Sequence, residues 1–101
     1  MTRWMLNAAV LGLLVAPAAS HAAGDSEAGK QKSATCQGCH GADGLGLQPI
    51  YPRLAGQYPD YLAKALHDYK AGMRQNAIMQ GMVAALSDQD IEDLAAYYGN
   101  L

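Results

Sequence analysis

The sequence contains no phenylalanine, and its single tryptophan, Trp4, lies near the amino terminus. It has only two cysteines, so the chain could form one disulfide at most. Tyrosine, leucine and methionine must therefore supply the large side chains of any core. A chain of 101 residues holds one domain at most, and a domain this short buries only about 60% of its unfolded surface. Such a domain usually needs a disulfide, a metal or another group to complete it.

Positive charge is also scarce, with seven Lys and Arg residues against nine Asp and Glu. No cluster of basic residues is present, and nucleic-acid binding requires one, so we expect no nucleic-acid partner. The sequence also lacks internal repeats and segments that alternate between apolar and polar residues, as half-buried strands do. These absences predict an all-α protein.

The first 22 residues have the pattern of a secretory signal peptide, with Arg3 before an apolar run over 5–15 and small residues up to Ala22. A membrane anchor is the alternative, but this run is much shorter than the about 20 residues that cross a bilayer. We therefore expect cleavage after Ala22, a mature domain over 23–101 with no membrane-spanning segment, and a periplasmic location. Loss of Arg3 leaves six basic and nine acidic residues, a net charge of −3.

Three helical patterns are expected in the mature chain, separated by loops rich in glycine and proline. The first covers about 26–37, with Asp25 as its N-cap, and the second covers 58–72, where Gly72 ends it. The third begins at Ser87, with Asp90 completing a capping box, and presents an apolar stripe of Ile91, Leu94, Ala95 and Tyr98. Residues 73–86 fit no clean period and are expected to be irregular.

Cys36, Cys39 and His40 form the pattern C-x-x-C-H, for which three kinds of chemistry compete. A redox-active dithiol is expected in a βαβ setting, which is absent here. A zinc site needs four ligands, and outside this motif the mature chain offers only His67. Covalent haem attachment is the usual meaning of the pattern, because residues i, i+3 and i+4 share one helix face. Both sulfurs could then bind one haem edge while His40 holds the iron.

The residue on the other side of the iron decides between electron transfer and chemistry at an open position. Met73, Met79 and Met82 lie in the segment before the last helix, although methionine more often simply fills a core. His67 is a rival ligand, but it lies off the apolar stripe of its helix and is expected to be exposed. A ligating imidazole also donates its second N–H to an acceptor, here expected to be a carbonyl between Leu45 and Ile50.

On these residues the chain resembles class I c-type cytochromes, especially small bacterial periplasmic ones and the single-haem halves of dihaem cytochromes. The similarity runs through "AGDSEAGK", "CQGCHGADG", "YPRLAGQYPDYLAKAL" and "MQGMVAALSDQDIEDLAAYYG", and so covers nearly all of 23–101. It implies three main helices around one covalent haem c, with iron held by His40 and by Met79, or alternatively Met82. It also implies that Gly29 and Tyr97 lie where the first and last helices cross, so that Gly29→Val should destabilise more than Gly24→Val.

The resemblance further implies a non-enzymatic carrier of single electrons between larger redox proteins, such as membrane or periplasmic oxidases and reductases of a respiratory chain. Because the sequence stops soon after the last helix, a monohaem protein is expected, as a monomer or in weak association. An electron-entry haem subunit of a periplasmic dehydrogenase or oxidase is the alternative. An enzyme or gas sensor with a five-coordinate haem is a third possibility.

Overall fold

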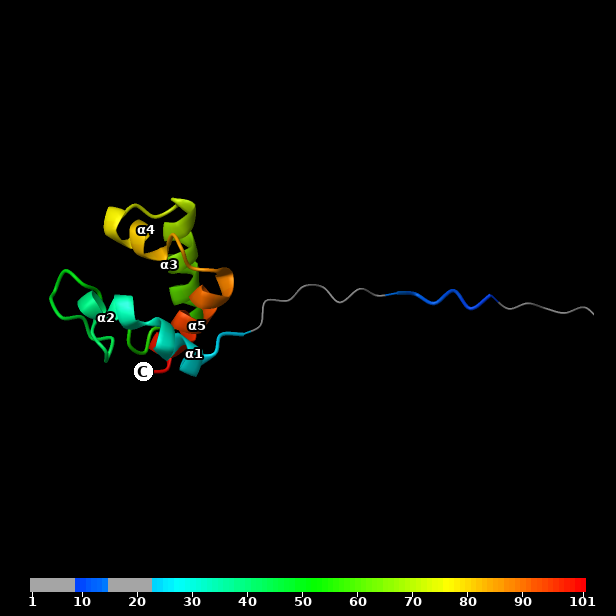
Figure 1. Cartoon of the computed structure of the whole chain (residues 1–101), viewed down its shortest axis with the longest axis horizontal. Coiled ribbons are helices and arrows are strands. Elements are labelled where there is room, and N and C mark those ends of the chain that lie inside the picture. Colours follow the sequence, from blue (N-terminus) through cyan, green and yellow to red (C-terminus); the bar gives the residue numbers. More distant parts are fainter. Residues whose placement is uncertain (1–8, 15–22) are drawn as a thin grey trace, which may run out of the picture.

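The computed structural model describes residues 9–14 and 23–101, and these form five α-helices and no strand (Figure 1). The helices are α1 (Ser26–Lys32), α2 (Ala34–His40), α3 (Pro59–Ala71), α4 (Ala77–Val83) and α5 (Asp88–Gly99). The all-α prediction is confirmed. Most of the predicted signal peptide lies outside the described residues, and its cleavage stays a prediction.

The first predicted helix is in fact two helices that meet at Ser33 and extend as far as His40. Ser33 has a 0% exposed side chain, and its hydroxyl donates to the Lys30 carbonyl at 2.7 Å. Such a local bond from a side chain to the backbone competes with regular helical pairing. The break redirects the chain, so that α2 carries the cysteine motif away from the line of α1.

The prediction of an irregular segment over 73–86 is wrong, because residues 77–83 form α4. Asn76 is its N-cap, and the side-chain oxygen of Asn76 accepts a hydrogen bond from the Met79 amide at 3.0 Å. Asparagine is a preferred N-cap, so the signal was present in the sequence. The apolar period was obscured because only Val83 of this helix is buried.

The other two helices match their predicted limits closely. Proline at the first position of α3 starts it, and Gly72 ends it with a φ of 75° in the left-handed region. Ser87 and Asp90 form the predicted capping box at the start of α5. The four predicted stripe residues of α5 are all at most 3% exposed and pack against Leu62 and Ala63 of α3. Helix α5 is therefore the centre of the core, between α1 and α3.

Helices α1 and α5 cross closely at Gly29, as the resemblance implied, and Gly24 lies in the segment just before α1. A Cβ atom on Gly29 would lie 2.0 Å from the Asp93 carbonyl oxygen and 2.8 Å from the Tyr97 Cβ atom. Gly24 proves equally confined, since a Cβ atom there would lie 2.0 Å from the Glu92 carbonyl oxygen. The structure gives no geometric basis for ranking Gly24 as the more tolerant position.

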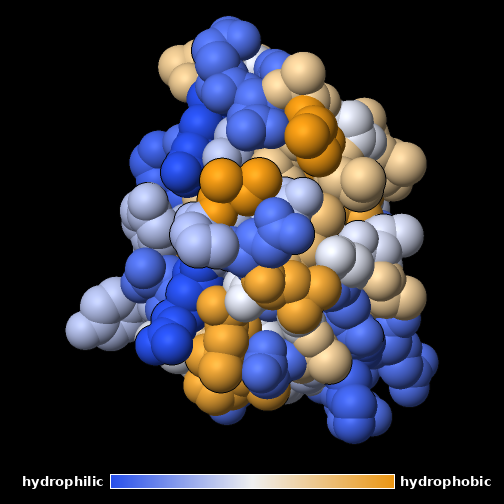
Figure 2. Space-filling model, turned by 90° about the vertical axis from the view of Figure 1, so that its left-hand side faces the viewer, coloured by the Kyte–Doolittle hydropathy of each residue, from blue (hydrophilic) through white to orange (hydrophobic). Residues whose placement is uncertain are grey.

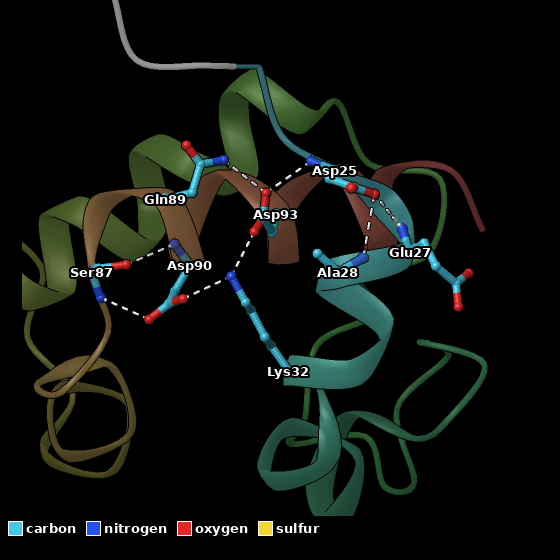
Figure 3. A network of polar contacts seen from close by, with 8 residues as sticks. All are labelled: Asp25, Glu27, Ala28, Lys32, Ser87, Gln89, Asp90 and Asp93. Carbon is cyan, nitrogen blue, oxygen red and sulfur yellow. Dashed lines mark hydrogen bonds and ion pairs between the residues drawn. The ribbon is translucent and has the colours of Figure 1, made fainter.

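A polar network joins the same two helices (Figure 3). The carboxylate of Asp93, 3% exposed, accepts hydrogen bonds from the Asp25 amide at 2.8 Å, the Lys32 ammonium at 2.6 Å and the Gln89 amide group at 2.8 Å. Lys32 also pairs with Asp90 at 2.8 Å. The Asp25 backbone bond and the bond from Lys32 lower the pKa of Asp93 from 3.8 to about 2.

We predict that Gly24→Ala and Gly29→Ala each destabilise the fold by about 1–3 kcal/mol, because the added methyl group forces the segment before α1, or α1 itself, away from α5. Gly81→Ala in α4 is the control, since nothing lies within 4 Å of the added atom and alanine is the better helix former. Urea unfolding of the haem-loaded variants measures the difference. Equal stability of Gly29→Ala and the unaltered protein would contradict the close crossing.

We predict that Asp93 makes the fold acid-sensitive. Its pKa is lower in the folded than in the unfolded chain, so its stabilising contribution is complete above about pH 4 and disappears as the pH falls toward 2. Asp93→Asn should cost about 2 kcal/mol at pH 7, as expected for lost hydrogen bonds to a charged group, and should flatten the pH dependence between 4 and 2. Unfolding measured across this range checks it, with the exposed Asp60→Asn as control.

Candidate haem site

A cavity of about 490 Å³ lies among α2, α3, α4 and α5, within the usual size range of cofactor sites. Most of its lining is apolar, including Leu62, Leu66 and Leu94. The helices therefore surround a space that their own side chains do not fill.

The cysteine motif forms one wall of this cavity. Cys36, Cys39 and His40 all lie on α2 and all line the cavity, as their helical spacing predicts. Both thiols are free, and His40 is 7% exposed. Burial raises the pKa of the Cys36 thiol, so this sulfur is held in its neutral form.

The imidazole of His40 is fixed by the backbone of the following loop. Its Nδ1 atom lies 2.8 Å from the carbonyl oxygen of Pro52. A carbonyl oxygen can only accept, so Nδ1 carries the proton and the lone pair is on Nε2, the atom free to bind a metal.

The expected acceptor, a carbonyl between Leu45 and Ile50, was therefore placed slightly too early in the chain. The start of this segment has another role. The amides of Gly46 and Leu47 donate to the carbonyls of His40 and Cys39, at 2.7 Å and 3.0 Å, and so close the end of α2. Gly46 has a φ of 79°, which permits this turn. The loop reaches the imidazole only after the turn, at Pro52.

The predicted sulfur ligands separate clearly in the structure. Met79 and Met82 both line the cavity from α4, and Met79 is the less exposed of the two, with Met82 at 50%. Met73 is 79% exposed and does not line the cavity. His67 also lies outside the lining, 3.8 Å from Asp88 and 3.6 Å from Glu92. The structure thus brings two methionines, but neither Met73 nor His67, to the wall formed by α4.

The donor set fits a haem better than a bare metal ion. In residues 9–14 and 23–101, no three His, Cys, Asp or Glu side chains come together in a way that could hold a metal ion. Two thiols, an imidazole and two thioethers instead line one largely apolar space, which matches a macrocycle attached at its edge and ligated on both faces. Zinc, one of the alternatives considered from the sequence, is not supported by this geometry.

Two features of the cavity were not recognised from the sequence. Tyr98 was assigned to the apolar stripe, but its buried hydroxyl has no hydrogen-bond partner. Arg53 and Arg74 also line the cavity, and the Arg74 guanidinium carbon lies 4.9 Å from the centre of the Tyr69 ring. The arginines could have been noticed as the cations flanking α3. Whether the Tyr98 hydroxyl finds a hydrogen-bond partner depends on contacts across the fold, and no neighbouring residue in the sequence indicates it.

No helix in the described part of the chain is long and apolar enough to cross a membrane.

Known proteins resemble this chain in both sequence and fold. The family model "Cytochrome c" matches residues 26–101. Cytochrome c4 of Pseudomonas aeruginosa is 51% identical over 81 residues, which are 80% of this chain and 40% of that protein. Cytochrome c-554(548) of Halomonas halodenitrificans is 49% identical over 81 residues, 77% of this chain and 98% of that protein. The thiosulfate dehydrogenase electron acceptor of Thiomonas intermedia is 45% identical over 101 residues, 98% of this chain and 44% of that protein.

Among solved structures, reduced recombinant cytochrome c4 from Pseudomonas stutzeri superposes with a TM-score of 0.73 at 49% identity, over 76% of this chain and 45% of that one. The chain thus spans between about 40% and 53% of the length of the cytochrome c4 relatives that it matches. The all-helical fold agrees with these likenesses. The chain belongs to the cytochrome c family, and haem c with its iron is its cofactor.

Proposed function

We propose that this chain is a periplasmic electron carrier that transfers single electrons between larger redox proteins and is not itself an enzyme. The proposal rests on one observation: two sets of potential haem-binding side chains line the same cavity. The C-x-x-C-H motif lines it from α2, and two methionines line it from α4. When bound, haem c supplies a one-electron couple of its iron. The described residues provide anchors, axial ligands and an apolar enclosure for it.

Each residue of the two walls has a proposed role. The sulfurs of Cys36 and Cys39 would attach the haem, and Nε2 of His40 would be the first ligand of its iron, because Nδ1 is engaged by Pro52. Met79 would be the second ligand, with Met82 as the alternative. Met79 is favoured since it is less exposed and its backbone amide is held by Asn76. Ligands on both sides leave no open position for substrate or gas, which favours electron transfer over catalysis.

The cavity rim supplies a docking surface for redox partners. Ile50, Ile78 and Met82 line the cavity, yet they are 75%, 65% and 50% exposed. Figure 2 shows hydrophobic patches among polar ones on the face where α4 and the loop after α2 lie. An apolar rim beside the cofactor permits close approach of a partner without strong binding, as transient electron transfer requires. The net charge of −3 expected for residues 23–101 favours partners with basic patches around their docking sites.

The alternative proposal is an electron-entry haem subunit of a periplasmic dehydrogenase or oxidase. It is favoured by the relative from Thiomonas intermedia, whose name describes an acceptor of electrons from thiosulfate dehydrogenase. A permanent subunit should co-purify with a catalytic chain, whereas a carrier should dock and dissociate. Size-exclusion chromatography of the protein from its own host separates the two.

We predict that the exported protein loses residues 1–22 and retains one haem after denaturation and acid extraction. Mass spectrometry should give the mass of residues 23–101 plus one haem. Cys36→Ser and Cys39→Ser should each leave a product with one thioether or a poorly matured one, because each sulfur forms its own bond. A haem that is extracted completely from the unaltered protein would contradict covalent attachment.

We predict that Met79→Ala abolishes the weak near-red absorption of an iron–thioether bond, lowers the reduction potential and allows carbon monoxide to bind the reduced protein. Met82→Ala is the matched control on the same helix. It should keep the band and lose only about 1 kcal/mol of stability, since half of this side chain is already exposed. Absorption spectra and redox titration test both variants. The reverse pattern would assign the ligand to Met82.

A further inference from the structure

The hydroxyl group of Tyr98 is buried without a hydrogen-bond partner. Tyr98 is 3% exposed, and its oxygen is closed off from solvent. Buried polar side-chain atoms nearly always have a partner, and an unpaired one is unfavourable. The neighbouring Tyr97 shows the contrast, because its hydroxyl donates to the Ala42 carbonyl at 3.1 Å. The protein therefore supplies a hydrogen-bond partner for the hydroxyl of Tyr97 but not for that of Tyr98.

The surroundings of Tyr98 limit what could serve as its partner. Tyr98 lines the haem cavity together with Cys36, and Cys36 packs against the cluster that contains Tyr98. Burial raises the pKa of Tyr98, so this hydroxyl keeps its proton and remains a donor. Ser33 is also close, and its hydroxyl donates to the Lys30 carbonyl and accepts from Gln37, which leaves one lone pair as a competing acceptor for Tyr98.

Haem attachment changes the hydrogen-bonding capacity of the Cys36 sulfur. A free thiol is both a weak donor and a weak acceptor, whereas a thioether sulfur only accepts. In the attachment, S–H adds across a vinyl C=C bond: sulfur bonds to one carbon, hydrogen goes to the other, and no external oxidant or reductant is needed. The Cys36 sulfur then has lone pairs but no proton, so it can act only as an acceptor. An unpaired hydroxyl can donate its proton to such an acceptor. In a haem the carboxylates are attached on the side of the macrocycle away from the vinyl groups, so a haem bound through Cys36 would carry them away from this sulfur.

We propose that the Tyr98 hydroxyl donates a hydrogen bond to the Cys36 thioether sulfur in the haem-loaded protein. Tyr98 is then a positioning residue for this attachment, and the inference rests on the covalent attachment proposed above. A donor at the thioether withdraws electron density from the haem edge, which disfavours the oxidised state and raises the reduction potential.

The test compares Tyr98→Phe with Tyr97→Phe in the haem-loaded protein. Mass spectrometry first establishes that both variants carry one covalent haem, so that a failure of attachment is distinguished from a failure of this inference. Tyr98→Phe should lower the reduction midpoint, because the donor is lost. Tyr97→Phe should leave the midpoint unchanged while reducing stability, because its hydroxyl bonds only to the backbone. Equal midpoints for Tyr98→Phe and the unaltered protein would overturn the proposal.

Resonance Raman spectroscopy provides an independent readout. The C–S stretching band of the Cys36 thioether should shift between H₂O and D₂O in the unaltered protein and in Tyr97→Phe, but not in Tyr98→Phe. A band that is insensitive to D₂O in the unaltered protein would overturn the proposal, as expected if the hydroxyl donates to Ser33 instead. If Tyr98→Phe fails to mature, 3-fluorotyrosine at position 98 replaces it. This stronger donor should raise the midpoint, and an unchanged or lower midpoint would refute the hydrogen bond.

Discussion

The structure depends on a cavity that the polypeptide encloses but does not fill. Without phenylalanine, and with its one tryptophan in the predicted signal peptide, the chain has few side chains large enough to close its own core. Its buried apolar residues instead form a layer of α5 and α3 side chains behind the space of about 490 Å³. A short domain of this kind is stable when a bound group supplies the missing apolar surface. The haem is thus part of the core as well as the redox centre, which links maturation directly to folding.

The crossing of α1 and α5 provides the rigid frame for this cavity. Gly29 lets the two helix backbones approach closely, and Gly24 does the same for the segment before α1. The carboxylate of Asp93 also binds the start of α1. Because α2 follows α1 after a single residue, this contact also fixes where the cysteine motif can lie. The break at Ser33 then directs Cys36 and His40 toward α5 and α3. The position of the wall that carries the cysteine motif is therefore determined by contacts made outside the cavity.

Most of the fold could be predicted from local signals in the sequence. Asp25, Gly72 and the pair Ser87–Asp90 marked helix ends because capping chemistry depends on neighbouring residues alone. Three features escaped prediction because they depend on contacts across the fold. The close approach at Gly24, the acceptor role of Pro52 and the unpaired hydroxyl of Tyr98 all require knowledge of which segments meet. Helix α4 was missed for another reason, since a mostly exposed helix shows no clear apolar period.

The two walls of the cavity are held with unequal strength. The wall formed by α2 is fixed at its end by the loop amides and at His40 by Pro52. The wall formed by α4 is a seven-residue helix with one buried residue, Val83, and it packs mainly on α3. Attachment requires accurate placement of two sulfurs, whereas a single methionine can reach the iron from a more adjustable segment. This difference explains why spacing alone could propose the C-x-x-C-H residues as the attachment site, while Met79 and Met82 must be distinguished by burial and by experiment.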